Sequence, residues 1–535
     1  MNMVRLLALG RPLAVVPLLA LSLAGQGLDP RLLLKQPTDT WPTYNGDYSG
    51  RRYSPLTQIT KDNVDQLGLA WVYRATTGGD FNPFGSQVKS TPLEVNGVLY
   101  FTIPDHAWAV DARTGRELWH FKWETKGGIH IGNRGVGIYE NWLYFETPDC
   151  QLISLNMKDG KKRWSAEICD GKQHYFASAA PVIIRNHVIV GVSGDDLDVP
   201  GYLESRDPET GQVQWRWNTE PKKGEPGSET WPNEEAMSHG GGMTWMPGTY
   251  DPELNLYYLG TGNPQPVLAG KGRGGDNLFT ESIVALNPDT GKMAWYFQPS
   301  PHDTHDWDAV QMPVLFDGEL HGVKRKLLAQ ASRNGYFFVL DRTNGEHLLT
   351  KPYIQTNWAE RIDDRGRPMR NLKKDPAPDG ALVSPASDGA TNWPPPSYSP
   401  DTGLFYVSAA RSFSVFYLTD LNNKPEGWGG VDRNAWSNFY LRAIDYQTGD
   451  IRWSKDWGSS SWGLSGLLST AGKILFTGDT SGNFMALDAA TGDPLWHVNL
   501  NANVSNGPMS YELDGVQYIV VGVGDSLYAF KLPRK

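Results

Sequence analysis

The residues best suited to chemistry are two aspartates in the acidic stretch that runs from Ser300 to Asp308. Asp306 and Asp308 stand two positions apart, so on an extended strand both carboxylates face one side while Trp307 faces the other. Two carboxylates that share one space favour a bound cation or a shared proton. The structural alternative is a surface turn in which the aspartates are simply exposed.

Two other polar groups follow apolar, strand-like runs. Ser193-Gly194-Asp195-Asp196 comes directly after the run 188–192, and Asn263 comes after the run 256–259. Because each group stands at a strand end, one repeat unit apart, we expect Asp196, Asn263 and Asp306 to converge as oxygen ligands of a hard cation.

The same acidic stretch holds two histidines, His302 and His305. Imidazole nitrogens would suit a transition metal such as zinc. The other candidate ligands are all hard oxygen donors, which favours a turn or supporting role for both histidines.

The elements that must position these residues are repeated along the chain. In the repeated phrase a strand ends in Asp or Asn, a turn ends in Gly, and the next strand usually carries Trp. Its seven copies have their turn glycines at Gly115, Gly160, Gly211, Gly291, Gly345, Gly449 and Gly492. The intervals between them are 45, 51, 80, 54, 104 and 43 residues, which is typical of a propeller with two long insertions.

Trp71, 48 residues before Trp119, supplies the Trp strand of an eighth unit. The sequence therefore predicts an all-β fold, an eight-bladed β-propeller of four-stranded antiparallel blades. The terminal strand 525–531 should pair with N-terminal residues to close the ring. The repeated tryptophans should pack between blades, and the insertions at about 217–250 and 352–440 should form long loops over the central pocket.

The N-terminus has the pattern of an export signal. Residues 1–24 contain Arg5 and Arg11, then a short apolar run, and end in the small-x-small pattern of a signal-peptidase site. We expect a cleaved signal peptide over 1–24, a periplasmic location, and one propeller domain over 25–535. An uncleaved membrane anchor is the alternative. No later stretch is apolar enough to cross a bilayer, so the mature chain should contain no transmembrane segment.

Composition excludes several classes of protein. Of the 535 residues 39% are hydrophobic, and the net charge is −10 with a pI near 5.6. An acidic chain of this kind argues against nucleic acid as a partner. Two cysteines exclude a disulfide-rich scaffold and any four-cysteine metal site, and the absence of Cys-x-x-Cys-His excludes a covalently attached c-type haem.

The two cysteines flank one predicted hairpin. Cys150 precedes the strand-like run 151–155, Cys169 follows the run 163–168, and the turn 158–160 lies midway between them. A regular hairpin would place their Cβ atoms opposite each other, so we expect a disulfide in the oxidising compartment. A bulge in either strand would shift the register and leave two free thiols.

Four segments together carry a resemblance to a known family. They are Trp41-Pro-Thr-Tyr-Asn-Gly-Asp47, Arg52-Tyr-Ser-Pro-Leu-Thr57, Gly260-Thr-Gly-Asn-Pro264 and Pro301-His-Asp-x-x-Asp306, alongside the repeated Trp phrase. In these segments the chain resembles the alcohol dehydrogenases that depend on pyrroloquinoline quinone (PQQ), the methanol and ethanol dehydrogenase type of quinoprotein. The resemblance spans nearly the whole mature length.

The resemblance implies a metal and a base. Asp196, Asn263 and Asp306 would hold the metal that polarises the quinone carbonyl, with calcium expected. Asp306 would also be the general base that takes the alcohol proton while hydride passes to PQQ. Asp308 matches the extra carboxylate of the lanthanide-using branch, which makes a lanthanide the alternative metal.

The same resemblance implies a set of residues around PQQ. Arg333 would donate hydrogen bonds to the reactive oxygens, and Trp245 would stack on the planar quinone. The other positions that match cofactor contacts are Arg134, Ser178, Gly194, Asp195 and Asn392.

Three departures from the family pattern stand in this chain. The adjacent, disulfide-linked cysteine pair is absent, and that region reads Gly127-Gly-Ile-His-Ile-Gly-Asn-Arg134. Lys89 replaces the usual acidic residue, and Met243 stands where the motif has threonine. An ammonium group could still pair with a carboxylate or an oxygen of the quinone.

The leading hypothesis is a periplasmic quinoprotein dehydrogenase that oxidises an alcohol or a sugar-like hydroxyl. Its electrons would leave to an external acceptor of the cytochrome c type, because the chain itself has no haem sequence. The alternative is a non-catalytic propeller, empty of cofactor, that acts as a binder or scaffold. A metal-dependent hydrolase would need an activated water, and the sequence offers no serine or cysteine nucleophile phrase.

Overall fold

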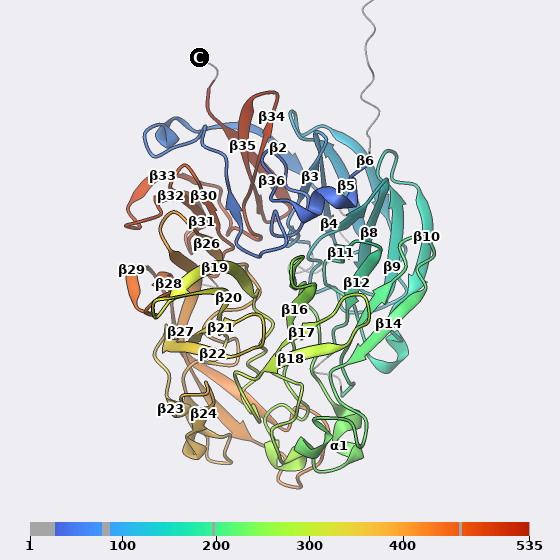
Figure 1. Ribbon diagram of the computed structural model, residues 1–535, viewed down its shortest axis with the longest axis vertical. Helices are drawn as coiled ribbons and strands as arrows, with labels where there is room; N and C mark the ends of the chain where they lie inside the picture. Colours follow the sequence, from blue (N-terminus) through green and yellow to red (C-terminus); the bar gives the residue numbers. More distant parts are fainter. Residues whose placement is uncertain (1–26, 77–85, 195–197, 460–462, 534–535) are drawn as a thin grey trace, which may run out of the picture.

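The computed structural model describes residues 27–76, 86–194, 198–459 and 463–533, and these ranges consist mainly of β-strands joined by turns and loops. Within them the strands form eight sheets of four or five strands and one two-stranded sheet. Figure 1 shows the larger sheets following one another in chain order around the molecule. The all-β prediction is confirmed.

The strands of the larger sheets are mostly consecutive in sequence. The first four sheets are β3 (Leu93–Val95), β4 (Val98–Ile103), β5 (His106–Asp111), β6 (Glu117–Lys122); β7 (Gly137–Tyr139), β8 (Trp142–Thr147), β9 (Gln151–Asn156), β10 (Lys162–Glu167); β11 (Val182–Ile184), β12 (His187–Gly191), β13 (Tyr202–Arg206), β14 (Val213–Asn218); and β15 (Thr249–Asp251), β16 (Leu256–Gly260), β17 (Ile283–Leu286), β18 (Met293–Phe297).

The remaining sheets include the long strands and the two chain ends. They are β19 (Val314–Leu320), β20 (Val323–Ala331), β21 (Tyr336–Asp341), β22 (His347–Pro352); β23 (Ala359–Ile362), β24 (Pro368–Arg370); β25 (Ala381–Val383), β26 (Ser397–Ser399), β27 (Leu404–Leu418), β28 (Gly430–Asp445), β29 (Ile451–Gly458); β1 (Tyr53–Ser54), β30 (Leu468–Thr470), β31 (Ile474–Gly478), β32 (Asn483–Asp488), β33 (Pro494–Asn499); and β2 (Gly68–Arg74), β34 (Met509–Leu513), β35 (Val516–Val523), β36 (Ser526–Lys531).

Helices are short in the part of the chain that the structure describes. One α-helix, α1 (Glu234–His239), begins after Asn233, whose side-chain oxygen accepts the backbone N–H of Ala236 at 2.9 Å. The 3₁₀ turns are η1 (Pro30–Leu34), η2 (Val64–Gln66), η3 (Gly171–Gln173), η5 (Ser228–Thr230), η6 (Gly270–Arg273) and η7 (Leu372–Lys374). Figure 1 places α1 in a loop region outside the sheets.

The repeated phrase forms the turn between the third and fourth strand of a sheet. In the turn after β5, the Asp111 carboxylate accepts the backbone N–H groups of Arg113 and Thr114, each at 3.0 Å. Gly115 then takes φ +68°, a conformation that costs glycine little, and donates its N–H to the Asp111 carbonyl at 2.8 Å. Local chemistry thus explains both ends of the Asp-x-x-x-Gly phrase.

Six of the seven turn glycines pack against a tryptophan from the last strand of the preceding sheet, and the seventh, Gly449, packs against Lys351 and Leu349 because the phrase at Gly345 carries no Trp. A Cβ atom on Gly115 would lie 2.6 Å from the Trp71 ring in β2, and one on Gly160 would lie 2.7 Å from Trp119 in β6. The same arrangement joins Gly211 to Trp164, Gly291 to Trp215, Gly345 to Trp295 and Gly492 to Trp453. The predicted role of these tryptophans in packing between sheets is confirmed.

The core lies between neighbouring sheets. β3, β4 and β5 are almost wholly buried, whereas the fourth strand, β6, buries Trp119 and exposes residues on its other face. That alternation is what a strand with one solvent-facing side requires.

The chain ends meet in one sheet. β2 pairs antiparallel with β36, with Trp71 opposite Ala529 and Tyr73 opposite Leu527, and Figure 1 shows blue β2 beside red β36. The expectation that the terminal strand pairs with N-terminal residues is confirmed.

Cys150 and Cys169 form the predicted disulfide, with their Cα atoms 5.0 Å apart. The predicted register was wrong by one residue, because a bulge between Lys162 and Trp164 places Gln151 opposite Glu167. We expected a bulge to leave two free thiols, but the disulfide is present together with the bulge. Both cysteines lie just beyond the paired residues of β9 and β10, and Cys150 adopts φ +66°.

Candidate functional site

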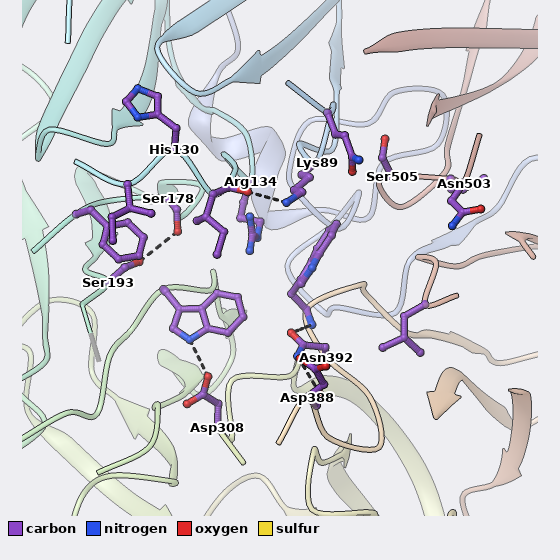
Figure 2. Close-up of a pocket in the computed structure, with 18 of the residues that line it drawn as sticks. Lys89, His130, Arg134, Ser178, Ser193, Asp308, Asp388, Asn392, Asn503 and Ser505 are labelled. Carbon is purple, nitrogen blue, oxygen red and sulfur yellow. Dashed lines mark hydrogen bonds between the residues drawn. The ribbon is translucent and has the colours of Figure 1, made fainter. Parts of the chain in front are cut away.

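One cavity of about 750 Å³ collects most of the predicted site residues. The predicted site residues that line it are Arg134, Ser178, Trp245, Asp306, Asp308, Arg333 and Asn392. Figure 2 shows Arg134 near the centre of these side chains, with Asp308 below it and Ser178 to one side. Residues that are up to about 260 positions apart in the sequence therefore share one space.

The carboxylates converge on a single guanidinium. Arg333 donates from Nη2 to Asp306 Oδ2 at 3.1 Å and from Nη1 to Asp308 Oδ2 at 2.8 Å. Burial raises the pKa of Asp308, and the Arg333 cation offsets part of that rise. Burial opposes the charged form of Arg333, but the carboxylates of Asp306 and Asp308 outweigh it and raise its pKa. The two carboxylates therefore favour the charged form of Arg333.

The two aspartates do not lie on a strand as predicted. Residues 300–312 form turns and bends, and Asp306 adopts φ +67°. Asp303 organises this turn, because its Oδ2 accepts the backbone N–H groups of His305, Asp306 and Trp307 at 3.0, 2.8 and 3.2 Å. Both carboxylates reach Arg333 through the turn rather than through strand alternation.

Trp307 and the two histidines face away from the cavity. Trp307 is fully buried, stacks on His305 with ring centroids 4.4 Å apart, and donates from Nε1 to the Ala386 carbonyl. His305 bonds the Lys374 carbonyl through Nε2, and His302 bonds the Gly275 carbonyl through Nδ1. Neither histidine lines the cavity, which agrees with the supporting role favoured from sequence.

Trp245 and Arg134 form the next part of the wall. Trp245 donates from Nε1 to Asp308 Oδ2 at 3.0 Å. The Arg134 guanidinium carbon lies 5.4 Å from the Trp245 ring centroid and 4.7 Å from that of Trp393. The Arg134 backbone N–H donates to the Ser178 carbonyl at 3.0 Å, and the Ser178 hydroxyl lies 3.2 Å from that of Ser193.

Asn392 reaches the cavity from the long insertion. Its Nδ2 donates to the Asp388 carbonyl at 3.0 Å, and its Oδ1 accepts the Trp393 N–H at 2.8 Å. Asp388 and Trp393 line the cavity beside it. The insertion 352–440 therefore covers part of the pocket, as predicted, and the insertion 217–250 contributes Trp245.

Two predicted residues lie outside the cavity lining. Asn263 is fully buried behind it and donates its backbone N–H to Asp308 Oδ1 at 2.7 Å. Gly194 packs against Val199 and the His174 carbonyl. Asp195 and Asp196 lie outside the described residues. Within the described ranges, no group of three or more His, Cys, Asp or Glu side chains is close enough to hold a metal ion.

Three cavity or near-cavity residues had no assigned place in the sequence prediction. Lys89 lines the wall beside Arg134, and Asp388 lines the opposite side. Glu281 is fully buried with no hydrogen-bond partner at either carboxylate oxygen, and burial, with Asp303 and Asp308 nearby, raises its pKa well above the usual range. Glu281 stands in a polar run, and nothing in the sequence around it indicates that it is buried near the site. Lys89 was noticeable only as a departure from a family pattern.

The arrangement of sheets around one polar, aromatic cavity defines a class of β-propeller protein with a ligand site at its centre. The family model described as the beta-propeller domain of PQQ glucose/ethanol/alcohol dehydrogenases matches residues 41–353 and 429–519. The chain belongs to this family. The unmatched interval falls within the long insertion.

Relatives and solved structures agree with the family match. The chain is 36% identical over 519 residues to the quinoprotein alcohol dehydrogenase PedH of Pseudomonas putida, covering 89% of this chain and 84% of that protein. The quinohemoprotein alcohol dehydrogenase structure of Comamonas testosteroni superimposes with a TM-score of 0.86 at 32% identity, covering 95% and 82%. A europium-containing methanol dehydrogenase gives 0.82 at 28% identity, covering 93% and 99%.

The residues present fit the cofactor that the family implies. A flat indole, Trp245, and two cations, Lys89 and Arg134, line one cavity, and these suit a planar ring that carries carboxylates. Arg134 keeps two buried N–H groups, at Nε and Nη1, without a hydrogen-bond partner. Asp306 and Asp308 supply hard oxygen donors, which suit calcium or a lanthanide rather than a soft metal.

No helix in the described ranges has the length and hydrophobicity that a bilayer crossing requires. The predicted signal peptide, residues 1–24, lies outside those ranges.

Proposed function

We propose that the protein is a periplasmic quinoprotein dehydrogenase that oxidises an alcohol or a sugar-like hydroxyl. Residues 25–535 would form one eight-bladed propeller domain, and residues 1–24 a cleaved signal peptide. The observation that carries the proposal is the meeting of Asp306, Arg333 and Trp245 in one cavity of a chain that belongs to this family. The relatives and solved structures support the same activity.

Asp306 would take the proton of the substrate hydroxyl. Its side chain is 18% exposed and lines the cavity, so a substrate can reach it, and Arg333 holds it in place through an ion pair at 3.1 Å. Asp308 would fix Trp245 through the indole N–H and share Arg333. Asp306, Asn263, Asp308 and Asp196 are the residues proposed to hold the metal.

Bound PQQ would supply the acceptor for the carbon-bound hydrogen and its electron pair, and bound calcium or a lanthanide would supply the Lewis acid. Arg134, Ser178, Asn392 and Trp245 would hold and orient the cofactor, and Gly194 and Asp195 are proposed as further cofactor contacts. The electrons would then leave to an external acceptor of the cytochrome c type.

The test uses purified protein incubated with PQQ and either calcium or lanthanum chloride. We expect a shift of the PQQ absorbance and dye-linked oxidation of an alcohol. Asp306→Ala should keep its melting temperature without ligand but lose turnover at saturating PQQ and metal by about 10²- to 10⁴-fold, the contribution of a general base. Asp159→Ala is the matched control, because Asp159 lies on an exposed turn between β9 and β10.

Two results would contradict the proposal. If neither metal produces an absorbance shift or turnover, the non-catalytic propeller becomes the better reading. If holoenzyme forms and Asp306→Ala turns over like Asp159→Ala, the base is another group.

A further inference from the structure

Two positive side chains lie together on one wall of the cavity, and among the described residues neither has a carboxylate partner. Lys89 Nζ donates to the Ile131 carbonyl at 2.6 Å, and Arg134 Nε and Nη1 are buried without any hydrogen-bond partner. A Cβ atom on Gly132 would lie 2.7 Å from Lys89 Cδ and 2.9 Å from Arg134 Nη1, so both chains reach the same glycine. Neither forms an ion pair within the described part of the chain.

Burial makes this pair costly. Burial, with the Arg134 cation beside it, lowers the pKa of Lys89 to about 8, and burial lowers the pKa of Arg134 to about 10. Trp245 and Trp393 offer ring faces to Arg134, but a ring face stabilises a cation without accepting its N–H groups in the way that a carboxylate does. Buried charges of one sign are normally balanced by a partner of the other sign.

The aspartates that line the cavity interact with Arg333 rather than with Lys89 or Arg134. Asp306 and Asp308 are both paired with Arg333, and the largest charge acting on Asp388 is also that of Arg333. Figure 2 shows Asp308 and Asp388 on the lower side of the cavity and Lys89 with Arg134 on the upper side. Among the described residues the cavity is therefore polarised, with acidic side chains at one end and the cations Lys89 and Arg134 at the other.

We propose that Lys89 and Arg134 form a two-cation clamp that binds a carboxylate group of the ligand and sets which end of the ligand faces Asp306. The inference rests on the proposed function, since the carboxylate would belong either to PQQ or to a hydroxy-acid substrate. Lys89 is thus a binding residue, and its ammonium supplies a contact that an acidic residue at this position could not supply to an anion.

The variants separate charge from shape. Lys89→Met removes the cation and keeps an unbranched apolar stem, and Lys89→Arg keeps the positive charge. Lys292→Met is the matched control, because Lys292 is exposed in the turn before β18. Each variant is first melted without ligand, and we expect Lys89→Met to melt at or above the wild-type temperature, because a partly buried charge beside the Arg134 cation is lost.

Binding is measured by quenching of tryptophan fluorescence, first with PQQ plus calcium and separately with trimesate, a planar tricarboxylate that has no redox function. We expect Lys89→Met to weaken binding of both probes by about 10- to 100-fold, the usual range for a hydrogen bond to a charged group. Lys89→Arg should stay within about 3-fold of wild type, a fraction of that range. The salt dependence of binding should also become shallower in Lys89→Met.

The outcomes distinguish the two possible sources of the carboxylate. Weaker PQQ binding in Lys89→Met assigns it to the cofactor. Unchanged PQQ binding with a KM raised for a hydroxy acid, but not for the matching alcohol, assigns it to the substrate.

The outcomes also separate the clamp from the proposed function. If wild type binds trimesate through Lys89 but never binds PQQ, the clamp stands and the dehydrogenase proposal fails. If Lys89→Met equals wild type with both probes and both substrates, the clamp is wrong.

Discussion

At the residue scale, Asp303 decides where Asp306 can be. One oxygen of Asp303 accepts three successive backbone N–H groups, and the Asp303 side chain is almost wholly buried. That cap holds Asp306 at φ +67°, a backbone conformation that residues other than glycine rarely adopt. Asp303 does not line the cavity, so it acts on the chemistry only by positioning Asp306.

We therefore expect Asp303→Ala to lower kcat by about 10- to 100-fold, because displacing a catalytic group by about 1 Å can reduce the rate by that much. PQQ affinity should change little, since Asp303 does not reach the cavity. Asp303→Asn keeps one acceptor oxygen and should recover part of the rate, which a purely electrostatic role would not allow. Steady-state kinetics with the holoenzyme and a melting curve for each variant provide the test. A wild-type kcat in Asp303→Ala would show that the turn keeps its shape without the cap.

The sequence could predict those site residues that a short stretch of neighbouring residues marks out. Asp306 and Asp308 stood out as paired carboxylates, and the structure brings both to Arg333. The mode of convergence was not predictable, because the strand model ignored Asp303, whose side chain competes with strand hydrogen bonding. Glu281 and Asp388 reach the site through tertiary packing alone, and no spacing in the sequence marks them.

At the element scale, one bulge recurs in every sheet that carries the turn phrase. The register shifts between the third and fourth strands, for example between Ala109 and Val110, between Ser205 and Arg206, and between Ala486 and Leu487. The Asp-x-x-x-Gly turn thus comes with an extra residue, which strengthens local twist. This explains why the hairpin register around the disulfide was misjudged by one residue, although the number and spacing of the turns were read correctly from sequence.

The lengths of β27 and β28 were also beyond prediction. These strands run for 15 and 16 residues, about three times the usual length. They extend because residues 411–418 and 430–438, both within the insertion, pair with each other, and such pairing leaves no periodic pattern in the sequence.

The contact between turn glycine and tryptophan makes a prediction at this scale. Gly115→Ala should destabilise the protein for two reasons. The backbone angle φ +68° disfavours alanine, and the alanine Cβ would lie 2.6 Å from Trp71. Gly515→Ala is the control, since Gly515 has φ +73° with open space around its Cβ position. Denaturant unfolding should show a loss of about 1–2 kcal/mol for Gly515→Ala and about 1–3 kcal/mol more for Gly115→Ala. Equal losses would mean that the tryptophan moves aside at no cost.

At the scale of the whole molecule, stability depends on residues from opposite ends of the chain meeting in one sheet. β2 is the only partner that the described structure gives to the free edge of β36, and its register places Leu69 opposite Phe530 and Tyr73 opposite Leu527. Parallel pairing of β1 with β30 joins the N-terminal region to a second C-terminal sheet. Two separate pairings therefore tie the ends together, and an unpaired edge is a site for aggregation.

Two leucines on these paired strands test how much the closure contributes. Leu527 in β36 is fully buried, whereas Leu69 in β2 is 56% exposed. Leu527→Ala should leave a cavity in the core against the terminal sheet and cost about 2–5 kcal/mol of unfolding free energy. Leu69→Ala should stay within about 0.5 kcal/mol of wild type, as exposed substitutions do.

Because the terminal sheet closes the sequence of sheets, we expect one cooperative unfolding transition that shifts as a whole in Leu527→Ala. A separate early transition, with the rest of the protein unfolding at the wild-type denaturant concentration, would show that the terminal sheet is an independent unit and that closure does not stabilise the other sheets.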